Sequence, residues 1–108
     1  RTPYAAAKWG IVGLTASLAQ ELGPDGIRVN AILPGPVRGP RMDGVIRDRA
    51  EAEGVSIAEM EAAYLSRISL RRMVGPEDVA SLALYLCSPA GENISGQAIS
   101  LCGNVETL

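Results

Sequence analysis

The chain has 108 residues, of which 47% are hydrophobic and 20% are charged, and its formal net charge is −2 at pH 7. This composition is ordinary for a globular protein, and the length suits one modest core rather than two domains. The small negative charge argues against a nucleic-acid partner. The longest unbroken apolar run, Leu82–Cys87, is far shorter than the ~20 residues of a membrane span, so no membrane partner is expected.

The residue types that are missing narrow the chemistry further. Histidine is absent, and cysteine occurs only at Cys87 and Cys102. A chain without histidine has no Ser-His-Asp triad and no His-ligated metal. Two cysteines without CxxC spacing are too few for a zinc site, so we expect no metal site. The two cysteines could form one disulfide, but two reduced cysteines in a cytoplasmic protein are the favoured interpretation.

The first predicted element is a long helix. Thr2 is the expected N-cap, Pro3 suits the first helical position, and Gly23-Pro24 ends the helix. Apolar residues follow this helix in two stripes, which is typical of a helix that packs on two sides. The first stripe comprises Ile11, Leu14, Leu18 and Leu22, and the second comprises Ala5, Val12, Ala16 and Ala19.

Two short apolar segments, Ile27–Leu33 and Gln97–Leu101, are predicted to be strands. The first is stopped by Pro34-Gly35 and is typical of a buried parallel strand. Three helices are expected between them. They span Met42–Glu53, the residues after a Ser56-x-x-Glu59 capping box, and the residues from Gly75-Pro76 to Ser88-Pro89.

This order of elements predicts an α/β fold. A strand, a helical crossover and a second strand form a parallel βαβ unit, which is right-handed by rule. Two strands alone do not make a stable sheet. We therefore expect residues 1–108 to be the C-terminal part of a doubly wound parallel-sheet domain, with two strands and about four helices in this part.

Tyr4 and Lys8 are the most informative polar pair. Their i, i+4 spacing places both side chains on one face of the first helix. A free tyrosine, with a pKa of about 10, is a poor proton carrier at neutral pH. A nearby lysine ammonium lowers that pKa, so a tyrosine can then act as general acid or base on a hydroxyl or carbonyl oxygen. The spacing also arises by chance in about one chain in five of this length, which leaves a structural role open.

The motifs around this pair add context. The first predicted helix begins with YAAAK, and its end and the first predicted strand lie in the segment LAQELGPDGIRVNAILPG. Further along the chain, Arg72–Ala80 read RMVGPEDVA and Ser95–Leu101 read SGQAISL. In this order they resemble the C-terminal half of the short-chain dehydrogenase/reductase family, over nearly the whole chain. The resemblance implies one NAD(P)-binding Rossmann-type domain, of which this chain is the C-terminal portion, with residues 36–73 as the substrate lid.

The resemblance also assigns roles to individual residues. It implies that Tyr4 is the general acid/base, and that Lys8 lowers its pKa and hydrogen-bonds the nicotinamide ribose. Pro34, Gly35 and Val37 match the loop beside the nicotinamide, at the carboxyl end of a strand, where open α/β sheets bind ligands. Together these positions would form part of the site for NAD or NADP.

The family's N-terminal half carries elements that this sequence lacks. They are the glycine-rich phosphate loop, the residue that selects NAD or NADP, and the catalytic Ser and Asn; no G-x-x-x-G-x-G sequence occurs here. The resemblance implies an NAD(P)-dependent oxidoreductase that moves hydride between nicotinamide and an alcohol or ketone, a homotetramer at full length, with the 108 residues alone inactive. The alternative is a truncated, non-catalytic relative that serves as an assembly or regulatory partner.

The lid supplies candidate substrate contacts. Arg38 and Arg41 lie beside the expected nicotinamide loop and could clamp a carboxylate or phosphate, although a solvated loop arginine is the commoner case. Met42 is expected either to line an apolar substrate pocket or to pack the two lid helices together. Asn30, in the first strand, is expected to tie two backbones together rather than to catalyse. The same choice between pocket and packing applies to Val45, Ile46, Ile57, Met60, Tyr64 and Leu65.

Overall fold

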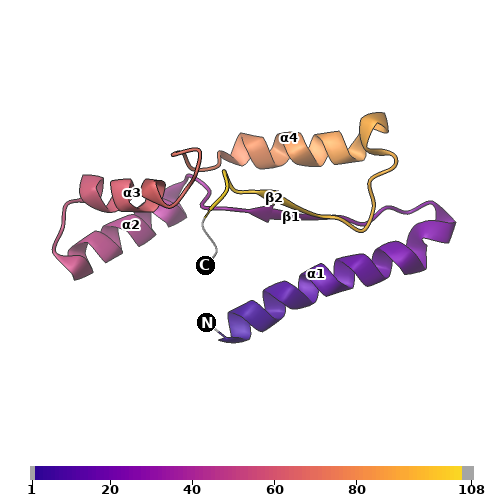
Figure 1. The fold of residues 1–108 in the computed structure, drawn as a ribbon, viewed down its shortest axis with the longest axis horizontal. Helices are drawn as coiled ribbons and strands as arrows, with labels where there is room; N and C mark the ends of the chain where they lie inside the picture. The colour runs from indigo at the N-terminus through magenta and orange to yellow at the C-terminus, as the bar shows by residue number, and fades with distance from the viewer. Residues whose placement is uncertain (1, 106–108) are drawn as a thin grey trace. The chain divides into compact units, whose positions relative to one another are not determined.

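The computed structural model describes residues 2–105 and divides them into two compact units. The first unit comprises residues up to Leu33 together with Ser81–Ser100, and the second comprises Pro34–Ala80 and the residues from Leu101 onward. The elements follow the chain in the order shown in Figure 1. They are α1 (Thr2–Leu22), η1 (Gly23–Asp25), β1 (Ala31–Pro34), α2 (Pro40–Glu53), α3 (Ile57–Ser66), α4 (Pro76–Cys87), η2 (Pro89–Gly91) and β2 (Ala98–Leu101).

This part of the chain, residues 2–105, has the expected mixed α/β architecture, with four α-helices and two strands. β1 and β2 pair with each other, and the pairing is parallel, because Ala31 N donates to Gln97 O and Gly35 N donates to Leu101 O. Between residues 2 and 105 no helix is both long and apolar enough to cross a membrane.

β1 is shorter than the predicted Ile27–Leu33 strand, because side chains replace part of the backbone ladder. Val29 N donates to the Ser95 hydroxyl at 3.2 Å rather than to a carbonyl. Asn30 then bridges the two segments: its Nδ2 donates to Ile94 O at 2.8 Å, and its Oδ1 accepts from Gln97 N at 3.1 Å. The expectation that Asn30 ties two backbones together is therefore confirmed.

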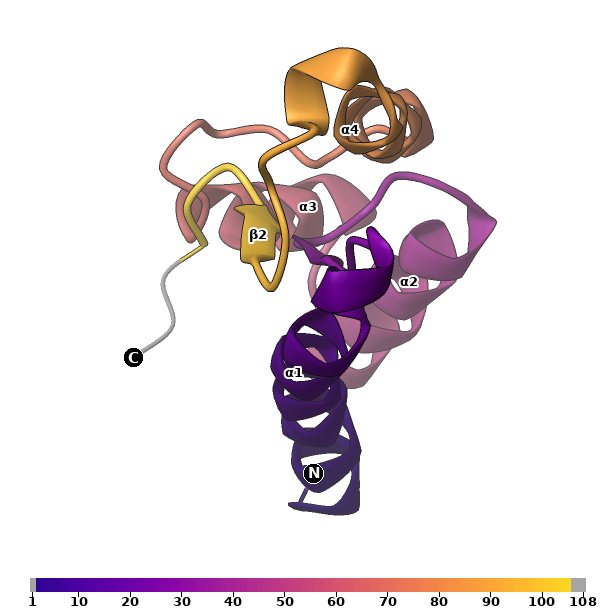
Figure 2. The ribbon, with the colours of Figure 1, turned by 90° about the vertical axis from the view of Figure 1, so that its right-hand side faces the viewer.

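In the first unit, α1 and the C-terminal half of α4 lie on opposite sides of the strand pair (Figures 1 and 2). α1 already includes Thr2, which was expected to be its N-cap. Among the described residues of this helix, Thr15 alone is buried. Both apolar stripes of α1 therefore leave much of their surface exposed: in the first stripe Ile11 is 50% and Leu14 56% exposed, and in the second Ala5 and Ala16 are exposed.

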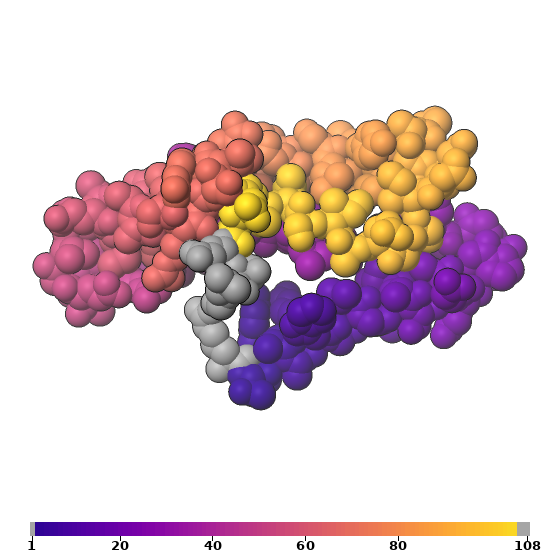
Figure 3. All heavy atoms as spheres, in the orientation of Figure 1, coloured from indigo at the N-terminus to yellow at the C-terminus, as the bar shows by residue number. Residues whose placement is uncertain are grey.

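In the second unit, α2 and α3 pack against each other, and their atoms form one close-packed body in Figure 3. The α3 capping box is present as predicted: Glu59 N donates to the Ser56 hydroxyl, and Ser56 N donates to the Glu59 carboxylate. Val45 is 43% exposed whereas its neighbour Ile46 is buried, because adjacent residues lie about 100° apart around a helix. The buried core residues are Ile46, Ala50, Met60, Ile68 and Met73, with Met42, Tyr64, Leu65 and Val105 packed against them.

Candidate active site

Tyr4 and Lys8 lie one helical turn apart near the start of α1. The Lys8 Nζ is 5.5 Å from the centre of the Tyr4 ring, so the structure brings the two side chains together on one helix face. Three alanines separate them, and alanine favours a regular helix at this point. Tyr4 is 64% exposed in the first unit, so a small molecule can reach both its hydroxyl and the lysine ammonium.

The loop after β1 has a fixed backbone in the second unit. Gly35 N donates to Leu101 O at 3.0 Å. A Cβ at Gly35 would lie 2.9 Å from both the Cα and the Cβ of Cys102, so no other residue fits without moving the chain. Beyond it, Val37 forms a parallel bridge with Val74, in which Arg38 N donates to Val74 O at 2.8 Å.

The three candidate substrate residues have different surroundings. Arg38 lines a groove of about 360 Å³ whose apolar floor includes the buried Ile46 and Met73. Arg41 is exposed. Met42 packs against the core between α2 and α3, which favours the packing alternative for this residue.

Sequence reasoning missed Arg47, which lines the same groove as Arg38. Its position could have been found from helix periodicity, because Asp43, Ile46 and Arg47 follow the i, i+3, i+4 spacing that shares one face. Glu61 of α3 also lines the groove, so two guanidinium groups and two carboxylates surround its apolar floor. This mixture suits a ligand that has both an apolar body and polar ends.

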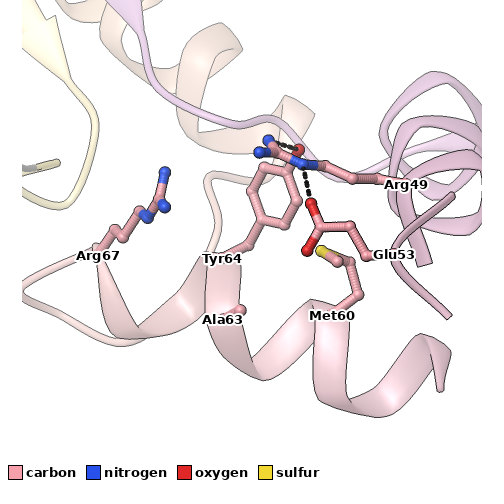
Figure 4. Close-up of a pocket in the computed structure, with 6 residues that line it drawn as sticks. All are labelled: Arg49, Glu53, Met60, Ala63, Tyr64 and Arg67. Carbon is pink, nitrogen blue, oxygen red and sulfur yellow. Dashed lines mark hydrogen bonds and ion pairs between the residues drawn. The ribbon is translucent and has the colours of Figure 1, made fainter. Parts of the chain in front are cut away.

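A second, smaller pocket lies between α2 and α3 and is shown in Figure 4. Arg49 is held in it by Glu53, with Nε 2.9 Å from Oε1, and by the Tyr64 hydroxyl, 3.3 Å from Nη1. The hydrogen bond with Tyr64, followed by that with Glu53, raises the pKa of Arg49. Its guanidinium also lies over the Tyr64 ring, 5.8 Å from the ring centre, so this cluster joins α2 and α3. Within residues 2–105 no group of three or more metal-ligating side chains comes together.

The donor set on α1 fits a nicotinamide riboside. An ammonium group has three N–H donors and a phenol is both donor and acceptor, which matches the vicinal hydroxyls of a ribose. A tyrosine next to a cation is also suited to exchanging a proton with a substrate oxygen. The pair therefore presents, on one helix face, hydrogen-bonding groups of the kinds that sugar hydroxyls can pair with.

Comparison with known proteins shows the family of this chain. Residues 1–103 match the family model described as Enoyl-(Acyl carrier protein) reductase. A short-chain dehydrogenase/reductase of Armillaria gallica is 43% identical over 103 residues, which cover 94% of this chain and 38% of that protein. The chain belongs to the short-chain dehydrogenase/reductase family, as its motifs indicated.

Two further relatives carry chemistry in their names. The D-beta-hydroxybutyrate dehydrogenase of Rhizobium meliloti is 36% identical over 104 residues, which cover 95% of this chain and 40% of that enzyme. A crystal structure of an actinorhodin polyketide ketoreductase variant with NADPH is 34% identical, has a TM-score of 0.87, and is matched over 99% of this chain and 41% of its own. The chain spans about two-fifths of the length of the curated relatives it matches.

Proposed function

We propose that this chain is the C-terminal part of an NAD(P)-dependent oxidoreductase that transfers hydride between the nicotinamide and an alcohol or ketone. The observation that carries the proposal is the Tyr4–Lys8 pair, with the ammonium 5.5 Å from the ring centre on an exposed helix face. The ketoreductase relative binds NADPH, and the hydroxybutyrate relative is a dehydrogenase, which agrees with this class of reaction. The residues that choose between NAD and NADP would belong to the N-terminal part of the fold.

In this proposal each residue of the chain has a defined task. Tyr4 gives a proton to, or takes it from, the substrate oxygen, and Lys8 stabilises the phenolate that is left and holds the ribose hydroxyls. Pro34, Gly35 and Val37 form the wall beside the nicotinamide. When bound, the cofactor supplies or accepts the hydride.

Among the candidate substrate residues, Arg38 has the strongest support, because it lines the groove with an apolar floor. A guanidinium there can pair with a carboxylate or another acidic group at the end of the substrate. Arg41 stays a candidate on its exposed position alone. Met42 would influence the substrate indirectly, through the lid packing in which it takes part.

The test is a Tyr4→Phe substitution in the full-length protein. Phenylalanine keeps the ring and removes the proton carrier, so turnover of a ketone panel with NADH or NADPH should fall about 10²- to 10⁴-fold. Binding of NAD(P)H, followed by fluorescence, should change little. Lys8→Arg should also lose activity, because a guanidinium has a different reach and geometry from an ammonium.

Tyr85 provides the matched control, since it is a half-exposed tyrosine on α4. Tyr85→Phe should retain the turnover of the unmodified protein. Unchanged turnover in Tyr4→Phe would overturn the assignment of Tyr4. An unmodified protein that reduces no ketone and oxidises no alcohol with either cofactor would favour the non-catalytic partner instead.

We also propose that the full-length protein is a cytoplasmic homotetramer. Two free cysteines in the described residues agree with a reducing compartment. The exposed apolar side chains of α1 suit a helix that is covered by a second copy of itself across a two-fold axis.

A further inference from the structure

Residues 101–105, which we name the strap, run between two parts of the second unit. On one side the strap contacts the loop after β1. Leu101 O accepts from Gly35 N at 3.0 Å, and the backbone of Cys102 occupies the space that a Cβ on Gly35 would need. The strap and this loop are therefore in direct backbone contact.

On its other side the strap contacts the segment that follows the second lid helix. Gly103 O accepts from Leu70 N at 3.1 Å, and Asn104 O accepts from Ser69 N at 3.0 Å. Gly103 has a φ of +64°, and a Cβ there would lie 2.8 Å from Cγ2 of Ile68. The end of the strap thus fits closely against Ile68.

Ile68 connects the strap to the interior of the lid. It is 1% exposed and belongs to the same buried cluster as Met60 of α3 and Ile46 of α2. A short antiparallel bridge between Ile68 and Val105 extends the contact, and Val105 itself packs against that cluster. An unbroken line of contacts therefore runs from Gly35 through the strap to the lid core.

From this line of contacts we propose that Cys102 and Gly103 are positioning residues. They set the distance between the loop at Pro34–Val37 and the lid helices, and so fix the lid over the substrate. The effect on catalysis rests on the proposed oxidoreductase function, whereas the mechanical coupling does not. Neither residue touches the reacting atoms in this proposal.

Gly103→Ala tests the coupling, and Gly54→Ala is its matched control. Both glycines have a left-handed φ, +64° and +68°, so both variants carry the same kind of backbone strain. The Cβ at Gly54 would meet no atom within 4 Å, whereas that at Gly103 would push Ile68. Any difference between the variants therefore reports the contact with Ile68.

The first readout is hydrogen–deuterium exchange of the full-length protein, measured by mass spectrometry. Gly103→Ala should speed exchange in the peptide with the Ser69 and Leu70 amides. If the strap couples the two sides, exchange should also quicken in the peptide with the Gly35 amide. Gly54→Ala should leave both peptides unchanged. Faster exchange at Ser69 and Leu70 with none at Gly35 would overturn the coupling.

The second readout is kinetic. Gly103→Ala should raise the KM for the ketone about 10-fold, because a displaced lid weakens binding of the ketone and of its transition state equally. The kcat and the affinity for NAD(P)H should change much less, because Tyr4 and Lys8 are untouched. A KM equal to that of Gly54→Ala would contradict the positioning role.

A double variant guards against simple misfolding. Ile68→Ala removes the Cγ2 atom that the new methyl group would meet. The double variant Gly103→Ala/Ile68→Ala should therefore have a lower KM than Gly103→Ala alone. If the contact is purely structural, the decreases in the free energy of unfolding caused by the two substitutions should add. The KM of the folded protein should then be the same in every variant. If the unmodified protein has no activity, the proposed function fails, and the exchange experiment alone still decides the coupling.

Discussion

Replacing Arg28 by methionine should strongly destabilise the fold. Nη1 of Arg28 donates to Leu86 O at 2.6 Å and to Gly91 O at 2.8 Å, and it lies 3.4 Å from Ile94 O. It therefore satisfies carbonyls at the end of α4 and in η2 while its own backbone leads into β1. Methionine keeps most of the apolar stem and removes every donor.

The magnitude follows from the number and kind of hydrogen bonds lost. A hydrogen bond from a charged donor contributes about 1.5–3 kcal/mol, and two short ones are lost here. The interaction of a cation with the helix C-terminus adds about 0.3–1 kcal/mol. Because Arg28 is only half-buried, water can hydrogen-bond to some of the freed carbonyl groups. We therefore expect the free energy of unfolding to fall by about 3 kcal/mol.

Urea unfolding of the full-length protein measures this loss from the shift in midpoint. Arg28→Lys keeps the charge but not the planar donors, so it should recover part of the stability. Arg67→Met, at an exposed arginine that follows α3, should change the free energy of unfolding by about 0.5 kcal/mol or less. If Arg28→Met proves no more destabilising than Arg67→Met, the carbonyl contacts contribute nothing to stability.

Two further predictions concern α3 and α1. The hydrogen bonds with the Ser56 backbone and hydroxyl lower the pKa of Glu59 below its ordinary 4.5; the stability they provide is present above that value and lost as the pH falls through the lower folded value. The protection of the amides in the first turn of α3, taken relative to their intrinsic exchange rate at each pH, should thus fall in acid, and Glu59→Gln should abolish this pH dependence; an unaltered dependence in Glu59→Gln would count against the capping box. On α1, Leu14→Lys should reduce the molar mass measured by light scattering, whereas Gln20→Lys should not, and an unchanged mass would refute an interface on this face.

Most elements of the fold could be predicted because their signals are local. The Ser56–Glu59 capping box is one such signal, since both partners lie within four residues, and α3 begins at the residue after Ser56. The start of β1 could not be predicted in the same way. There, side-chain hydrogen bonds of Asn30 and Ser95 take the place of backbone hydrogen bonds between the strands. These bonds join residues 64 and 66 positions apart, and no sequence periodicity indicates so distant a pairing.

The same division applies to the candidate site. The Tyr4–Lys8 pair is predictable because the helix repeat alone brings its members together. The contact of Gly35 with Cys102 and that of Gly103 with Ile68 are long-range, and the tertiary fold determines them. A glycine in the sequence indicates a possible close approach, but the residue that approaches is known only once the chain has folded.

The polar residues of the IRVN segment have a structural role in this chain. Arg28 and Asn30 helped to reveal the family, yet in this structure both bind backbone groups of the segments around α4 and β2. They hold the strand from whose end the Pro34–Val37 loop extends. The Tyr4–Lys8 pair, by contrast, lies on a helix whose faces are largely exposed. Under the proposed function, the rest of the sheet and a neighbouring subunit would cover those faces, so the alignment of Tyr4 would depend on assembly as much as on this chain.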